Sequence, residues 1–125
     1  METTLTYKLA LLHLIHVLVN ADGVVDERER QLLETIRKEE NISDAVFHAF
    51  EARIMSSATK SVYEHGMKLL EDCSDEEKLQ VFAHLYRMAL ADDDMNMREV
   101  RLLFYALRTT QIDFDDVMLV ARMAS

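Results

Sequence analysis

The sequence predicts an all-α protein of about seven helices, and two observations carry this prediction. The 125 residues contain no proline and only two glycines, whereas sandwiches and barrels usually make their many tight turns with these residues or with Asn-Gly. Ser, Asp and Asn, which cap helices, separate the apolar segments instead. Half of the residues are apolar and 30% are charged, which is a globular composition. We therefore expect residues 1–125 to form a single helical domain.

The first two helices are predicted on either side of a short acidic segment. Apolar residues recur at helical spacing through residues 4–19, so this helix is amphipathic or largely buried. Residues 20–23 end it with a glycine, which suits the left-handed conformation that follows many helices. Asp26 then caps a helix over residues 27–39, and Glu29 completes a capping box.

Two further helices are predicted in the middle of the chain. Ser43 caps the third, which reaches about Met55. The fourth covers residues 61–71 and has Gly66 in its interior, where glycine costs about 1 kcal/mol relative to alanine. We expect a neighbouring helix to approach closely at this glycine.

Three helices complete the chain, and a Ser or Asx residue opens each of them. Ser74 and Glu77 have the capping-box spacing, and Asn96 and Glu99 repeat it. Asp113 caps the last helix, which is short. These caps place helices at about residues 75–90, 97–107 and 114–121.

The charge of the chain limits its partners. The sequence has 14 basic and 23 acidic residues, a formal net charge of −9. So acidic a chain repels phosphate backbones, and we expect no nucleic-acid binding. No apolar run is long enough for a membrane span, and residues 1–8 lack the pattern of a secretory signal. We therefore expect a cytoplasmic protein without direct membrane insertion.

Other kinds of chemistry find little support in the sequence. Cys73 is the single cysteine, so an internal disulfide and a Cys-based zinc site are excluded, and its acidic neighbours disfavour the reactive thiolate. His13 and His16 could together meet a transition metal, but no carboxylate lies within a turn of them, and we expect both to be packed or half exposed. The sequence has no recognisable catalytic or phosphate-binding motif, so we expect no enzymatic activity.

A displacement of 70 residues aligns the sequence with itself. Residues 21–29 then match residues 91–99 with identical Ala, Asp, Arg and Glu, and Asp26 meets Asn96. A Leu-Leu pair follows each segment, and an apolar pair precedes each at the same spacing. Two such helix–loop–helix units can pack about an approximate two-fold axis, each covering the apolar face of the other.

The first of these segments carries a resemblance to a known family. It reads Ala-Asp-Gly, then x-x-Asp-x-x-Glu and Leu-Leu, and it resembles the TerB-like domain of bacterial tellurite-resistance proteins over about residues 9–109. The resemblance implies an all-helical fold, cytoplasmic or attached to membrane proteins through other domains, without established enzymatic chemistry. It also implies divalent-metal binding through the acidic residues and a role in stress-response assemblies. The second segment departs from the pattern at Asp93 and Asn96, which weakens a second metal site.

Two interpretations of the acidic residues remain open. Helix capping alone explains Asp26 and Glu29. Asp22, however, lies at a helix end where negative charge is unfavourable, and it offers a third carboxylate to a hard cation. The second segment starts like an EF-hand loop but has Met97 and Leu103 where that loop needs Gly and Glu. The candidate ligands of weakly bound Ca²⁺ or Mg²⁺ are Asp22, Asp26, Glu29, Asp92, Asp94, Asn96 and Glu99.

The sequence is thus compatible with two classes of function. In the first, the domain is a metal-responsive stress module of the tellurite-resistance type. In the second, it is an adaptor whose acidic surface binds a basic protein partner or a second copy of itself, and metal has no role. Met95 and Met97, on either side of Asn96, are candidates for an exposed contact in either class.

Overall fold

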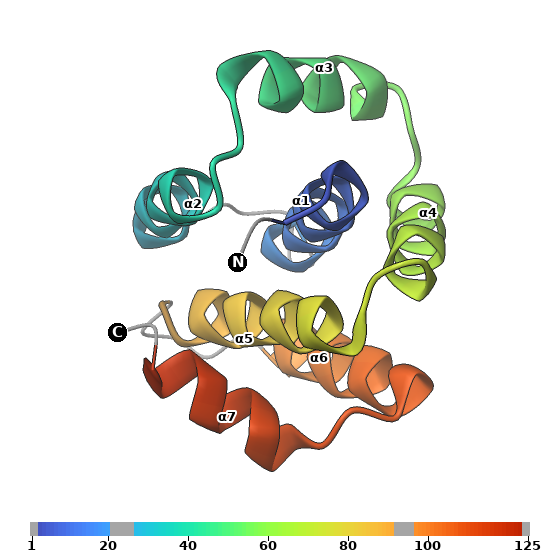
Figure 1. Ribbon diagram of the computed structural model, residues 1–125. Helices are drawn as coiled ribbons and strands as arrows, with labels where there is room; N and C mark the ends of the chain where they lie inside the picture. Colours follow the sequence, from blue (N-terminus) through green and yellow to red (C-terminus); the bar gives the residue numbers. More distant parts are fainter. Residues whose placement is uncertain (1–2, 21–26, 92–96, 124–125) are drawn as a thin grey trace.

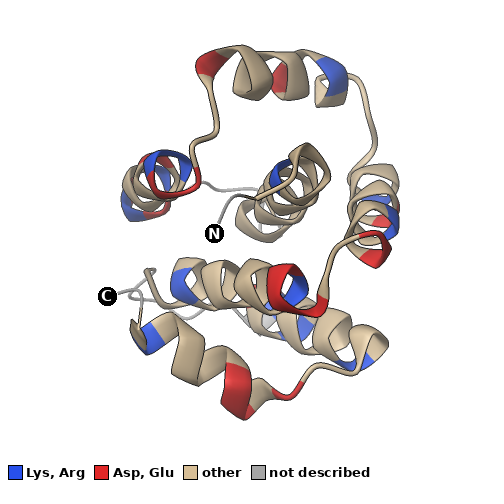
Figure 2. Ribbon diagram, in the orientation of Figure 1, with Lys and Arg blue, Asp and Glu red and all other residues tan. Residues whose placement is uncertain are grey.

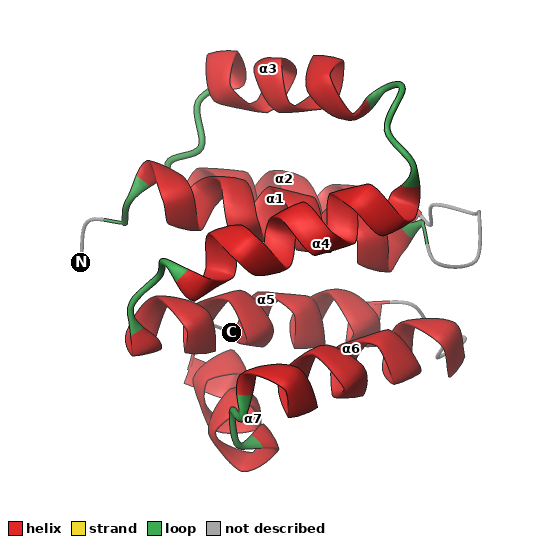
Figure 3. Cartoon of the chain, turned by 90° about the vertical axis from the view of Figure 1, so that its right-hand side faces the viewer, coloured by secondary structure: helices red, strands yellow, loops and turns green. Residues whose placement is uncertain are grey.

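The computed structural model describes residues 3–20, 27–91 and 97–123. All regular structure within these ranges is helical, as predicted (Figures 1 and 3). The seven helices found there are α1 (Leu5–Val19), α2 (Glu27–Glu39), α3 (Asp44–Ile54), α4 (Thr59–Glu71), α5 (Asp75–Ala91), α6 (Met97–Thr110) and α7 (Phe114–Met123).

Helix α1 lies in the middle of the N-terminal part of the fold, with α2, α3, α4 and α5 around it (Figure 1). Ten of its fifteen residues are buried. Lys8 is its only Lys, Arg, Asp or Glu, whereas acidic residues gather at the starts of α5 and α7 (Figure 2). A helix that is apolar on nearly all sides needs partners all round it. Of the two alternatives predicted for this helix, amphipathic or largely buried, the structure shows the second.

Helices α1 and α4 pack closely where Gly66 faces α1. A Cβ atom at Gly66 would lie 2.9 Å from the Cβ of His13 and 3.1 Å from Cδ2 of Leu14. Side chains do not approach one another so closely without a shift of one helix. The structure therefore confirms the close approach predicted at this glycine.

Side-chain caps open four of the described helices. Ser43 and Asp113 accept hydrogen bonds from backbone N–H groups three and two residues further on, at 3.2 and 2.9 Å. Ser74 and Glu77 exchange the two bonds of a capping box, at 3.1 and 3.0 Å. These three caps were predicted, and Thr4 adds a fourth, with its hydroxyl 3.1 Å from the N–H that it caps.

Helix α4 begins earlier than its sequence predicts. It starts at Thr59, two residues before the expected position, and its N-cap is Ala58, which makes no side-chain cap bond. Ala58 has no side-chain capping group, so the sequence contains no signal that marks this boundary. The predicted caps of α2 and α6, Asp26 and Asn96, lie outside the described residues.

The two ends of the molecule share features at a spacing of 70 residues. The side-chain caps of α1 and α5 have this spacing, and so do those of α3 and α7. Helices α2 and α6 are each followed by a residue of positive φ, Asn41 at 55° and Gln111 at 60°. In both cases the next residue donates to a carbonyl five residues earlier, at 2.9 and 3.3 Å, which is a Schellman cap. The similarity thus extends to three helices on each side of α4, while a two-fold relation between the halves stays a prediction.

Helices α3 and α7 differ in how closely they pack. Helix α7 lies against α5 and buries Val117 completely. Within α3, all of which is described, only Phe50 is buried, and the helix stands away from α1 (Figure 3). Arg37 holds the start of α3, because its guanidinium pairs with Asp44 at 2.7 Å and lies 4.0 Å from the centroid of the Phe47 ring.

Candidate functional site

Two of the seven predicted metal ligands, Glu29 and Glu99, lie in the described part of the chain. They occupy the first turns of α2 and α6, and each is only 1% exposed. A buried carboxylate is costly in its charged form unless positive charge or hydrogen bonds compensate it. Each of the two helices that follow the acidic segments therefore has a buried carboxyl group in its first turn. The other predicted ligands, Asp22, Asp26, Asp92, Asp94 and Asn96, lie outside the described residues.

Glu77 shows how a capping glutamate is used in the same fold. One carboxylate oxygen accepts from the N–H of Ser74 at 3.0 Å, and the other accepts from the N–H and hydroxyl of Thr4 at 3.2 and 3.0 Å. The hydrogen bonds from Ser74 and Thr4 hold the pKa of Glu77 below its usual value, although burial opposes this. Glu77 thereby ties the starts of α1 and α5 together. The sequence predicted its capping box with Ser74 but not its bonds with Thr4.

A buried polar network joins α1, the end of α2, and α5. The hydroxyl of Tyr7 donates to the Glu40 carboxylate, and Nε2 of His84 lies 3.0 Å from the same oxygen. The guanidinium of Arg87 lies 3.1 Å from Nδ1 of His84 and 2.9 Å from the carboxylate of Glu39. A guanidinium only donates, so Nδ1 of His84 accepts, and Nε2 carries the proton that is donated to Glu40.

This network acts as a tie between helices. Tyr7 is 0% exposed and His84 is 1% exposed, so neither side chain presents its polar atoms to a substrate in solution. The partners of Glu40 lie 33 and 44 residues away in the chain. No local spacing connects residues so far apart, which is why sequence reasoning missed the network.

His13 and His16 are packed against aromatic rings. The His13 ring lies 4.9 Å from the Phe50 ring and 5.0 Å from the His65 ring, and its Nδ1 donates to the carbonyl of Leu9 at 2.6 Å. Burial lowers the pKa of both His13 and His16, so both are neutral at pH 7. His13 is buried and His16 is half-buried, which agrees with the prediction that this pair is packed or half exposed.

Cys73 is buried beside the start of α5. Burial, followed by the charge of Glu77, raises the pKa of its thiol to about 11. The thiol is therefore protonated at neutral pH, and a protonated thiol is a poor nucleophile. The unreactive state predicted from the acidic neighbours holds, with burial as its larger cause.

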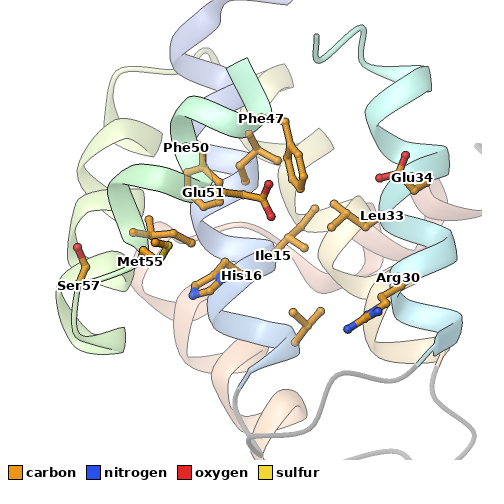
Figure 4. Close-up of a pocket in the computed structure, with 13 residues that line it drawn as sticks. Ile15, His16, Arg30, Leu33, Glu34, Phe47, Phe50, Glu51, Met55 and Ser57 are labelled. Atoms are coloured by element: carbon orange, nitrogen blue, oxygen red, sulfur yellow. The ribbon is translucent and has the colours of Figure 1, made fainter. Parts of the chain in front are cut away.

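A cavity of about 690 Å³ lies between α1, α2 and α3 (Figure 4). Ile15, Leu33 and Phe50 contribute apolar walls, one from each helix. Arg30 of α2 and Glu51 of α3 add charged groups to the lining. No local pattern of residues predicts this cavity, because it results from the distance between α3 and α1.

The family model of the tellurite resistance protein TerB matches residues 8–120. The chain belongs to the TerB family. No curated protein and no solved structure matches the chain. The match confirms the resemblance predicted over about residues 9–109 and extends it into α7 of this TerB protein.

Among its described residues, this TerB protein has neither a group of three metal ligands nor a membrane-spanning helix. Within residues 3–20, 27–91 and 97–123, no three His, Cys, Asp or Glu side chains come together as a metal site. Because five predicted ligands lie outside these ranges, the acidic metal site stays a prediction. Among the described helices, none combines the length and apolar character that crossing a membrane requires.

Proposed function

We propose that this TerB protein is a non-enzymatic stress-response module that binds a divalent cation, Ca²⁺ or Mg²⁺, at the acidic segments preceding α2 and α6. The observation that carries the proposal is the matched burial of Glu29 and Glu99, each 1% exposed in the first turn after an acidic segment. Ca²⁺ and Mg²⁺ prefer oxygen ligands, and carboxylates supply both those ligands and the compensating charge.

The chemistry of the donor set fits such a cation. Glu29 would act with Asp22 and Asp26, which gives three carboxylates within eight residues of sequence. Glu99 would act with acidic residues of the second segment, where Asn96 replaces an acid and contributes only a neutral amide oxygen. Fewer charged ligands weaken the binding of a hard cation, so the segment before α2 is the stronger site.

Thermal unfolding after chelation tests the proposal. At a Ca²⁺ or Mg²⁺ concentration tenfold above the dissociation constant, the folded state gains about 1.4 kcal/mol, since the cation binds the folded chain alone. This gain raises the melting temperature by roughly 5 °C for a domain of this size. The double variant Asp26→Ser and Glu29→Gln keeps a good helix cap, so it should match the wild type in chelator and lose the cation-dependent rise.

Glu77→Gln is the matched control, because it removes a carboxylate from a capping box whose bonds are already accounted for within the fold. It should lower the melting temperature in chelator and leave the rise with cation unchanged. No heat of binding and no shift in melting with either metal would contradict the cation site.

Exposed apolar side chains favour the adaptor function as a second candidate. Tyr105 of α6 is 61% exposed, and Leu119 and Met123 of α7 are 58% and 78% exposed. Contiguous patches of exposed apolar groups mark surfaces that bind other proteins or a second copy of the chain, and these three residues come from two consecutive helices. If the cation test fails, we propose the adaptor function in its place.

A further inference from the structure

The cavity between α1, α2 and α3 has the properties of a small-molecule site. Its volume of about 690 Å³ lies within the range of ligand pockets, roughly 300 to 1,000 Å³. Most of its lining is apolar, with a few charged groups added, which is the usual composition of such pockets. Helix α3, which forms one wall, is held at its start by Arg37 and in its middle by Phe50, so the cavity lies under an anchored helix.

The packing around the cavity differs from that at the equivalent place in the second half of the chain. Helix α7, the counterpart of α3 at the 70-residue spacing, packs directly on α5. An aromatic cluster lies at that end, with the Phe114 ring 5.0 Å from Phe104 and 5.4 Å from Tyr86. The charged lining residues also have apolar counterparts 70 positions later: Arg30 and Val100, Glu34 and Phe104, and Glu51 and Ala121. The positions that carry charged lining residues in the first half are therefore occupied by apolar residues in the second half, where α7 packs on α5.

Glu51 is the charged group best placed to meet a ligand. Figure 4 shows its carboxylate pointing into the cavity between the α3 wall and Ile15. Glu34 is paired with Arg37, at 2.8 Å. Within the described part of the chain, Glu51 makes no such bond, so its charge is available.

The surroundings of Glu51 suit a cation. The rings of Phe47 and Phe50 line the cavity on the same helix, and the Phe47 ring already lies 4.0 Å from one guanidinium, that of Arg37. Aromatic faces attract cations, and the attraction grows where water is displaced. His16, which also lines the cavity, is neutral at pH 7 because burial lowers its pKa. The net charge of −9 further raises the local concentration of cations.

We propose that this cavity binds a small amphipathic cation, a protonated amine on an apolar body. The ammonium group lies at Glu51 beside the aromatic rings of α3, and the body lies against Ile15 and Leu33. Arg30, on the α2 wall, disfavours a second positive charge and so restricts the ligand to one cationic end. This site uses none of the residues assigned to the divalent cation.

Three ligands with the same apolar body test the proposal: 4-phenylbutylamine, 4-phenylbutanol and 4-phenylbutyrate. Amide chemical shifts of the ¹⁵N-labelled protein are followed during each titration at pH 7. The amine should shift residues of α1, α2 and α3 around the cavity and bind about tenfold more tightly than the alcohol. The carboxylate should bind most weakly.

Two variants and one control separate charge from shape. Glu51→Gln, at an exposed position, should leave the fold intact and remove the preference for the amine. Leu33→Trp should fill the cavity and abolish the shifts with all three ligands. Glu71→Gln removes an exposed carboxylate at the end of α4 and should change nothing. Equal binding of the three ligands, tighter binding of the carboxylate, or shifts away from the cavity would overturn the proposal.

Discussion

Single residues in this protein hold together helices that are distant in sequence. Glu40, at the end of α2, accepts hydrogen bonds from Tyr7 of α1 and from His84 of α5. One carboxylate therefore connects three helices. Burial by itself would raise the pKa of Glu40, but the hydrogen bonds from His84 and Tyr7 together hold it below its ordinary value of 4.5. The folded state therefore favours the charged carboxylate.

This preference makes stability depend on pH in a defined direction. The stabilisation from Glu40 is complete above pH 4.5 and is lost as the pH falls through the lowered pKa. Urea unfolding should show a falling free energy between about pH 5 and pH 3, and Glu40→Gln should show a shallower fall. At pH 7 that variant should be less stable by about 1 to 3 kcal/mol, because a buried charged acceptor is lost. Glu71→Gln, at an exposed site, should follow the wild type, and an identical fall in all three proteins would refute the role of Glu40.

At the scale of elements, α1 and α4 can pack closely because residue 66 is a glycine and has no Cβ atom. An alanine at position 66 favours the helix by about 1 kcal/mol, but its Cβ would meet the Cβ of His13 at 2.9 Å. That atom is fixed to the backbone of α1, so the helices would have to move apart, at a cost of about 1 to 3 kcal/mol. We expect Gly66→Ala to destabilise the protein by about 1 kcal/mol in urea unfolding. Ser61→Ala, on the exposed side of α4, should be neutral or slightly stabilising, and a more stable Gly66→Ala variant would contradict this packing.

At the scale of the whole molecule, the shared caps and helix ends suggest two related halves joined by α4. We expect α1 and α2 to superpose on α5 and α6 in a crystal structure, with Asp22 on Asp92 and Glu29 on Glu99. Equivalent helix pairs then have similar crossing angles, because the same apolar pattern is buried in both. Unrelated crossing angles in the two pairs would reject the two-fold relation and leave a similarity of sequence alone.

The sequence by itself determined the features that depend on near neighbours in the chain. The caps at Ser43, Ser74 and Asp113 are bonds between residues two or three positions apart, so spacing was enough to predict them. The all-helical class followed from turn composition, and the TerB family from the acidic segment. Glu29 and Glu99 could be named as candidate ligands for the same reason, although the sequence did not show that both are buried.

Only the tertiary structure decided the features that need distant residues to meet. The Glu40 network and the bond from Thr4 to Glu77 join residues 33 to 73 positions apart, and no periodicity encodes such pairs. The cavity depends on how far α3 stands from α1, which is set by the anchors at Arg37 and Phe50 rather than by the propensity of any helix. Helix formation is local, whereas the placement of helices is a balance among all the side chains between them.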